Sequence, residues 1–278
     1  MRAFVTIVQL TLYEALRRRV LTAVLACGIA FLVLFGIGFH FIHADFMRHK
    51  GVAAVEIRLG MTFITLAGLF VINFLTLMTA VLLPVDTMSG EIESGVMQTI
   101  AVKPIPRAAI VLGKWAAFAI VLACYLAMMS GGVLLIARLI GNITLQQLYV
   151  GLPLMALESL VLLTLSIAGG TRFSTVTNGV ICFGLHGIAF IGSWVELIAT
   201  MTSNETARNV GTIASLLMPS DSMWQLAAHH MQPPIMADLQ LTPFSTPSVP
   251  TPAMVWWAAG YVIVTLAVAL RQFRRRPL

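Results

Sequence analysis

The sequence has few charged residues. Of its 278 residues, 10% are Asp, Glu, Lys or Arg and 59% are hydrophobic, and the mean hydropathy is +0.93. Soluble globular domains carry about 25% charged residues, so this composition excludes a water-facing surface of the usual kind. Cysteine is also scarce: the three cysteines are odd in number and all lie in apolar runs, which argues against a disulfide framework. We therefore expect a protein that lies in a membrane.

Six windows are apolar and long enough to cross a bilayer, which takes about 20 residues. The windows are residues 20–39, 61–83, 115–137, 148–170, 176–198 and 254–270. The sequence therefore predicts an all-α, polytopic membrane protein with six transmembrane helices. Residues 1–278 are expected to form a single transmembrane domain.

The basic residues are divided unevenly between the two sides of the predicted spans. Twelve of the 17 Lys and Arg residues fall on one side and five on the other, and loops rich in positive charge stay in the cytoplasm. We expect both termini to be cytoplasmic and the protein to lie in a bacterial plasma (inner) membrane. The net charge of +6 is then explained by anionic lipid headgroups beside the span ends, and not by nucleic acid.

Residues 1–19, ahead of the first span, have polar and apolar side chains on different sides of a helix. The polar set is Arg2, Thr6, Gln9, Tyr13 and Arg17. This spacing predicts an amphipathic helix that lies in the membrane interface. The alternative is that this segment extends the first span into the cytoplasm, and Glu14 fits either geometry.

A charged segment, residues 91–114, lies between two long apolar runs. Pro84 is expected to end the second span, and the acidic residues after it favour the start of a new helix, because anions complement the positive N-terminal end of the helix dipole. Pro104 is expected to stop that helix. We therefore predict a short cytoplasmic helix over residues 86–103. Its apolar side consists of Ile92, Val96, Met97 and Ile100. The alternative is a charged, solvated loop with no special role.

The order of residues in this segment resembles the coupling segment of type-2 ABC permeases, the exporter-like class with six spans per unit. The shared residues are, in order, Glu91, Glu93, Gly95, Val96, Pro104, Arg107, Gly113 and Lys114. The sequence departs from the family pattern at Val96, where many members have Thr, and at the additional Pro106. The resemblance extends over the whole chain through the number of spans, the inward termini and the long outer segment. Members of this family commonly begin with an elbow helix, and residues 1–19 resemble that helix.

This resemblance implies that a separate ABC ATPase subunit, present in two copies, drives the chain. The residues implied to contact it are Asp86, Glu91, Glu93, Gly95, Met97, Ile100, Pro104 and Arg107. It also implies a second permease copy, as a homodimer or with a sister chain. The chain has no GxxxxGK[ST] phosphate-binding loop, so ATP and Mg are expected on the partner ATPase and no cofactor is expected in this chain.

Asn73, Glu158 and His186 are polar residues inside the predicted spans, where ionisable groups are costly. Glu158 and His186 are each expected near the middle of a span and can form a pair. A substrate or proton role is open, and so is a packing role in which a neutral Glu158 is hydrogen-bonded to His186, Asn178 or a backbone carbonyl. Asn73 is better explained as an interhelical hydrogen-bond partner.

The long outer segment, residues 199–253, contains two short apolar pieces and then a Pro-rich loop. Neither piece can cross a bilayer alone. The resemblance implies a re-entrant helical hairpin that closes the outer end of the pathway, with Pro219, Asp221 and Trp224 at this outer gate. Such a dip is allowed only if its turn is buried in protein or lines a wet cavity. A pair of surface helices is the alternative.

Several histidines lie on the outer side. They are His40, His43 and His49, with Asp45 between them, and His229 and His230 further along. Histidine is the commonest metal ligand, and the permease of nitrous oxide reductase maturation is a metal-related member of the family that this chain resembles. No recognised ligand spacing is present, so we predict no metal site.

Three classes of function fit these features to different degrees. The favoured class is the permease subunit of an ABC transporter that exports a substrate, which makes the chain itself not an enzyme. An intramembrane enzyme is disfavoured because HExxH and GxSxG motifs are missing. A non-transporting membrane assembly subunit remains an alternative, and nothing in the spans identifies the substrate.

Overall fold

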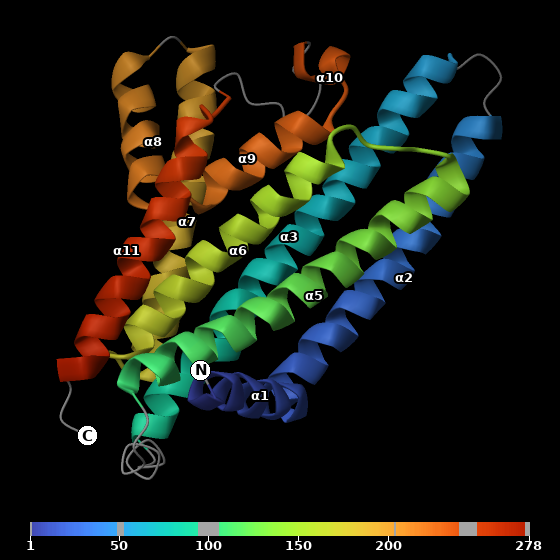
Figure 1. Cartoon of the computed structure of the whole chain (residues 1–278). Coiled ribbons are helices and arrows are strands. Elements are labelled where there is room, and N and C mark those ends of the chain that lie inside the picture. The colour runs from blue at the N-terminus through green and yellow to red at the C-terminus, as the bar shows by residue number, and fades with distance from the viewer. Residues whose placement is uncertain (1, 49–52, 94–105, 203, 239–248, 276–278) are drawn as a thin grey trace.

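The computed structural model describes residues 2–48, 53–93, 106–202, 204–238 and 249–275, and in these ranges the chain is helical with no strand (Figure 1). The helices are α1 (Arg2–Arg17), α2 (Arg19–Arg48), α3 (Ala54–Glu93), α5 (Arg107–Gly141), α6 (Leu148–Gly170), α7 (Thr175–Met201), α8 (Glu205–Leu217), α9 (Ser220–Met231), α10 (Pro234–Asp238) and α11 (Ala253–Arg275).

Six of these helices are long and apolar enough to cross a membrane, which confirms the predicted number of spans. They are α2, α3, α5, α6, α7 and α11. Most of them are longer than the apolar windows in the sequence. A window ends where charge begins, whereas the backbone of a helix continues through charged residues such as Arg107 and Arg48, which lie at the ends of α5 and α2. The fold thus defines an integral, multi-pass membrane protein.

The long helices run alternately up and down. The C-terminal ends of α3 and α11, the N-terminal end of α5 and the whole of α1 therefore lie at the same end of the bundle (Figure 1). We call this the basal end of the bundle. The basic residues concentrate there, as the sequence predicts. Those in the described ranges are Arg2, Arg17, Arg18, Arg19, Arg107, Lys114, Arg172, Arg271, Arg274 and Arg275. The first and last described helices therefore bring both chain ends toward the same end of the bundle.

Helix α1 is separate from α2. The helix is interrupted at Arg18, and α1 runs across the basal end instead of continuing the direction of α2 (Figure 1). It packs closely on α5: a Cβ added to Gly113 would lie 2.7 Å from Ile7 Cγ2, so a larger residue would push the two helices apart. The alternative in which α1 simply extends the first span is therefore wrong, while its location in the membrane interface stays a prediction.

Helix α3 continues past Pro84, so the predicted start of a separate helix after it is wrong, although the apolar span itself ends at Val85, beside the predicted end. Proline removes the N–H that would bond the carbonyl four residues earlier, and its ring crowds that carbonyl. Here α3 continues to Glu93, and the Ser166 hydroxyl of α6 donates to the neighbouring Val81 carbonyl at 3.2 Å. The carbonyl that Pro84 leaves without its helical donor is that of Ala80, one residue earlier, and membrane helices keep an internal proline where neighbouring helices pack around it. Residues 86–93 are thus the last turns of α3 and not the start of a separate helix.

The central helices of the bundle are α3 and α6. In each, 61% of the most apolar window is buried inside the protein, against 11% in α2 and 17% in α11. The peripheral helices instead expose large apolar side chains, such as Leu34 of α2 and Ile263 of α11. Such surfaces suit contact with lipid tails. Polar groups between α3 and α6 are therefore shielded by the rest of the bundle.

Candidate functional site

A cavity of about 600 Å³ lies among α3, α6, α7 and α9. Its lining joins the three candidate site residues predicted inside the spans to two of the three predicted at the outer gate. Those five are Asn73, Glu158, His186, Asp221 and Trp224. Pro219, the third gate residue, directly precedes α9 as its N-terminal cap position. The sequence placed these residues in two groups, and the structure places them at one site.

The polar centre of the cavity is a hydrogen bond between the two central helices. Asn73 Nδ2 of α3 donates to Glu158 Oε2 of α6 at 2.9 Å, and the two residues are only 3% and 1% exposed. Asn73 thus makes the interhelical bond that its position predicts. The predicted bonds from Glu158 to His186 or Asn178 are not the ones formed, and Asn178 instead donates to the Ser166 carbonyl at 2.7 Å.

His186 connects the cavity to the outer hairpin. It lies near the middle of α7, and its Nδ1 is 3.0 Å from the Ser220 hydroxyl at the start of α9. Ser220, Asp221 and Ser222 are all buried, as are most residues of α9. The turn between α8 and α9 therefore reaches the level of the middle of α7 inside the protein. A pair of surface helices does not describe α9, and the buried turn is what a re-entrant hairpin requires.

Helix α8 forms the first arm of the hairpin and packs against α7. Asn204 caps α8 by accepting a hydrogen bond from the Ala207 N–H at 3.2 Å. Trp257 Nε1 of α11 donates to the Leu216 carbonyl at 3.0 Å, which satisfies one of the free carbonyls in the last turn of α8. The hairpin is thus fixed to two spans while its other face, including Ile213, remains exposed.

Asp221 is a buried carboxyl at the turn of the hairpin. Burial raises its pKa from the ordinary value of 3.8 to about 6, and hydrogen bonds with the side chains of Ser193 and Gln225 partly oppose that rise. Gln225 Nε2 donates to Asp221 Oδ2 at 2.8 Å. The carboxyl group of Asp221 forms part of one wall of the cavity.

The raised pKa of Asp221 predicts a pH-dependent stability. An acid that binds its proton more tightly in the folded state stabilises the fold below its unfolded pKa, and this stabilisation is lost as pH rises through its folded pKa. For Asp221 the loss should occur between pH 3.8 and about 6. We expect the thermal midpoint in detergent to fall over this interval, and the fall to be smaller in Asp221→Asn. Glu205→Gln, at an exposed carboxylate on α8, is the control and should keep the slope of the unmodified chain.

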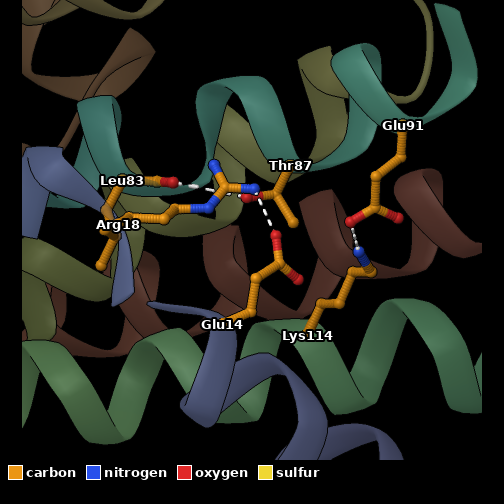
Figure 2. Close-up of polar contacts among 6 residues, drawn as sticks. All are labelled: Glu14, Arg18, Leu83, Thr87, Glu91 and Lys114. Carbon is orange, nitrogen blue, oxygen red and sulfur yellow. Dashed lines mark hydrogen bonds and ion pairs between the residues drawn. The ribbon is translucent and has the colours of Figure 1, made fainter. Parts of the chain in front are cut away.

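A second polar site lies at the basal end (Figure 2). Lys114 of α5 forms an ion pair and hydrogen bond with Glu91 of α3, and the two side chains are only 5% and 13% exposed. Glu91 Oε2 is buried and has no hydrogen-bond partner among the residues that the structure describes. Nearby, Arg18 donates to Glu14 at 2.6 Å in a more exposed pair.

Two of the residues implied to contact an ATPase have partners within the chain. Glu91 is paired with Lys114, so its carboxylate points into the protein. Arg107 Nη1 donates to the Arg274 carbonyl at 3.1 Å, and a cation at the C-terminal end of a helix complements the helix dipole. The motif that the sequence displays is thus in part an internal structure that holds α3, α5 and α11 together.

The other residues implied to contact an ATPase lie at the end of α3 or in the connection that follows it. The backbones of Asp86 and Glu93 belong to α3, and Asp86 to Glu93 fill its last turns. Gly95, Met97, Ile100 and Pro104 lie outside the described residues. Their contact with a partner stays a prediction.

The outer histidines do not gather into a metal site in the described part of the chain. There, no group of three or more His, Cys, Asp or Glu residues is placed to hold a metal ion. His230 Nδ1 is instead 2.7 Å from Gln147 Oε1, a contact between α9 and the start of α6.

Sequence reasoning did not find the aromatic walls of the cavity or the partner of Lys114. Phe70 of α3 and Trp224 of α9 pack with ring centroids 5.3 Å apart, and Phe183 and Phe190 of α7 line the same space. In a chain with 15 Phe residues, aromatic residues at apolar positions give no separate signal. Only the packing of the helices shows which of them meet.

Comparison with known protein families finds no match, and comparison with curated proteins finds none either. The resemblance to ABC permeases rests on the chain's own residues.

Proposed function

We propose that this chain is the membrane-spanning permease subunit of an ABC transporter, which exports a substrate using ATP hydrolysed by two copies of a separate subunit. The observation that carries the proposal is the continuity of α3. One helix carries Glu91 at the basal end and Asn73 at the cavity, about five turns away. A partner that moves the basal end of α3 therefore moves a wall of the cavity. Pro84 lies between Glu91 and Asn73, and proline is a common site of bending in helices.

The Glu91–Lys114 pair supports this mechanism. It fixes the last turns of α3 to the first turns of α5, so a force on the connection between these helices acts on both. In this proposal Glu91 stiffens the base, while Glu93 and the residues after it contact the ATPase. The concentration of basic residues at the basal end supports a cytoplasmic location for that contact, in a bacterial inner membrane.

A second copy of the chain completes the proposed transporter. The cavity reaches the side of the bundle between α3 and α7, where Phe74 and Phe190, which both line it, are 46% and 37% exposed. A partner copy or lipid can cover this opening. Opposed cavities from two copies would give the substrate a path between them.

The test is the double variant Glu91→Ala with Glu93→Ala, measured by ATPase co-purification and by ATP-dependent transport. We expect it to weaken ATPase docking or to uncouple hydrolysis from transport while membrane insertion is unchanged. The matched control is Glu56→Ala with Glu205→Ala, two exposed carboxylates at the opposite end of the bundle, which should keep both activities.

The single variants separate the two roles. Glu93→Ala should weaken docking, whereas Glu91→Ala should lower the thermal midpoint because it leaves Lys114 buried without its partner. An unmodified chain that purifies with no ATPase, or a double variant with normal coupling, would contradict the proposed function.

A further inference from the structure

The polar groups that line the cavity include two carboxyl groups, and its nitrogen donors belong to Asn73, His186 and Trp224. Glu158 and Asp221 contribute two carboxyl groups, and neither Arg nor Lys is among the residues that line the cavity. Asn73 gives its N–H to Glu158, and its own Oδ1 is buried with no partner among the described residues. Buried acceptors without donors are costly, because each has lost its hydrogen bonds to water. Among the described residues the site therefore has two carboxyl groups and one buried amide oxygen that has no donor, and no Lys or Arg lines it.

The remaining lining is apolar and strongly aromatic. Phe70, Phe183, Phe190 and Trp224 face the same space as the carboxyl groups, with Leu77 and Met78 nearby. Aromatic faces attract cations through their quadrupoles and also bind apolar groups. An anion would meet two carboxyl groups, and a wholly apolar molecule would leave the buried amide oxygen without a donor. The lining thus favours one chemistry, a cationic donor attached to an apolar body.

The volume and the opening agree with this chemistry. A space of about 600 Å³ is within the range that holds a drug-sized molecule. The exposed Phe74 and Phe190 place its opening on the side of the bundle that faces lipid or a second copy. An amphiphile dissolved in the bilayer can enter by this route without crossing water.

We propose that the cavity binds an amphiphilic organic amine, with its ammonium group between Glu158 and Asp221 and its apolar part among Phe70, Phe183 and Trp224. As the cargo of the transporter, this assignment rests on the proposed function. Binding itself does not, because the site lies within one chain. The ammonium supplies a donor for the buried Asn73 oxygen and a charge that complements the carboxyl groups, and the aromatic rings surround the rest.

The experiment uses the full chain in nanodiscs of uncharged phosphatidylcholine, with no ATP and no partner. The probe is dansylcadaverine, a fluorescent primary amine, and the matched probe is its N-acetyl derivative, which has the same apolar group but no charge. Empty nanodiscs give the partition background. We expect saturable binding of the amine at least tenfold tighter than that of the acetylated probe.

Variants assign the binding to the cavity. Glu158→Gln with Asp221→Asn should weaken binding of the amine at least tenfold and reduce its preference over the acetylated probe, while the exposed control Glu205→Gln should bind normally. If the double variant does not fold, Met78→Trp fills the cavity without changing its charge and should abolish saturable binding of the amine.

Two results would overturn the assignment: equal affinity of the unmodified chain for the two probes, or an unchanged affinity in Met78→Trp. Neither result would touch the proposed function, which is tested separately by ATPase co-purification and by the variants at the basal end. An ATPase-coupled chain without amine binding would keep the permease and reject this class of cargo.

Discussion

Lys114→Ala should lower the free energy of unfolding by about 3–5 kcal/mol, because it leaves the Glu91 carboxylate buried without its cation. Glu91 is only 13% exposed, and its Oε2 already has no partner among the described residues. Removal of Lys114 would leave both oxygens without a charged donor. The measurement is the thermal midpoint of the purified chain in detergent, compared with that of the unmodified chain.

Two controls show that the effect comes from an unpaired buried charge. Lys114→Met with Glu91→Leu replaces both partners by apolar side chains, and this double variant should recover most of the stability, since an apolar pair often replaces a buried ion pair without loss. Glu14→Ala breaks the neighbouring pair with Arg18, in which Glu14 is 42% exposed, and should change stability by about 1 kcal/mol or less. A Lys114→Ala midpoint as high as that of Glu14→Ala would contradict the prediction.

The number of spans could be predicted from the sequence because it depends on one local property. A bilayer is one of the few environments in which an apolar segment of about 20 residues is stable. All six windows lie in helices that are long and apolar enough to span it. The ends of the helices could not be predicted in the same way. Pro84 indicates a helix end by its local chemistry, yet α3 continues, and the hydroxyl beside it comes from Ser166, 82 positions further along the chain.

The residues of the candidate site could be predicted from the sequence, but their hydrogen-bond partners could not. Glu158, His186 and Asn73 were notable because polar groups inside spans are costly, and the cavity contains all three. The partners depend on how the helices rotate and cross, which the sequence does not show. Glu158 meets Asn73 and not His186, and His186 meets Ser220 from the hairpin.

Glu91 is the clearest example of this limit. The charge pattern around it is typical of a surface that binds a partner, but Lys114 lies close enough in the folded chain to hold its carboxylate. Both residues belong to the same motif in the sequence, separated by a proline-containing connection. A charged motif can therefore combine an internal pair with an outer contact, and only the fold assigns each residue to one or the other.

The last prediction concerns the contact between α7 and α8, where two glycines let the helices approach. A Cβ added to Gly211 would lie 2.6 Å from Glu196 Cβ and 2.7 Å from the Gly192 carbonyl oxygen, and a Cβ added to Gly192 would lie 2.4 Å from Ala214 Cβ. No rotamer change relieves a contact with a backbone or Cβ atom. Gly211→Leu should therefore separate the helices and destabilise the chain by about 1–3 kcal/mol, or more if α8 detaches.

The same substitution should also disturb the cavity, because α8 leads directly into the turn that carries Ser220 and Asp221. We expect a lower thermal midpoint together with weaker binding of dansylcadaverine. The control is Gly184→Ala, also on α7, where an added Cβ would meet nothing within 4 Å. Alanine favours helix over glycine by about 1 kcal/mol, so this variant should be at least as stable as the unmodified chain. If Gly211→Leu matched Gly184→Ala in both measurements, close packing of α8 on α7 would not be what holds the turn at the cavity.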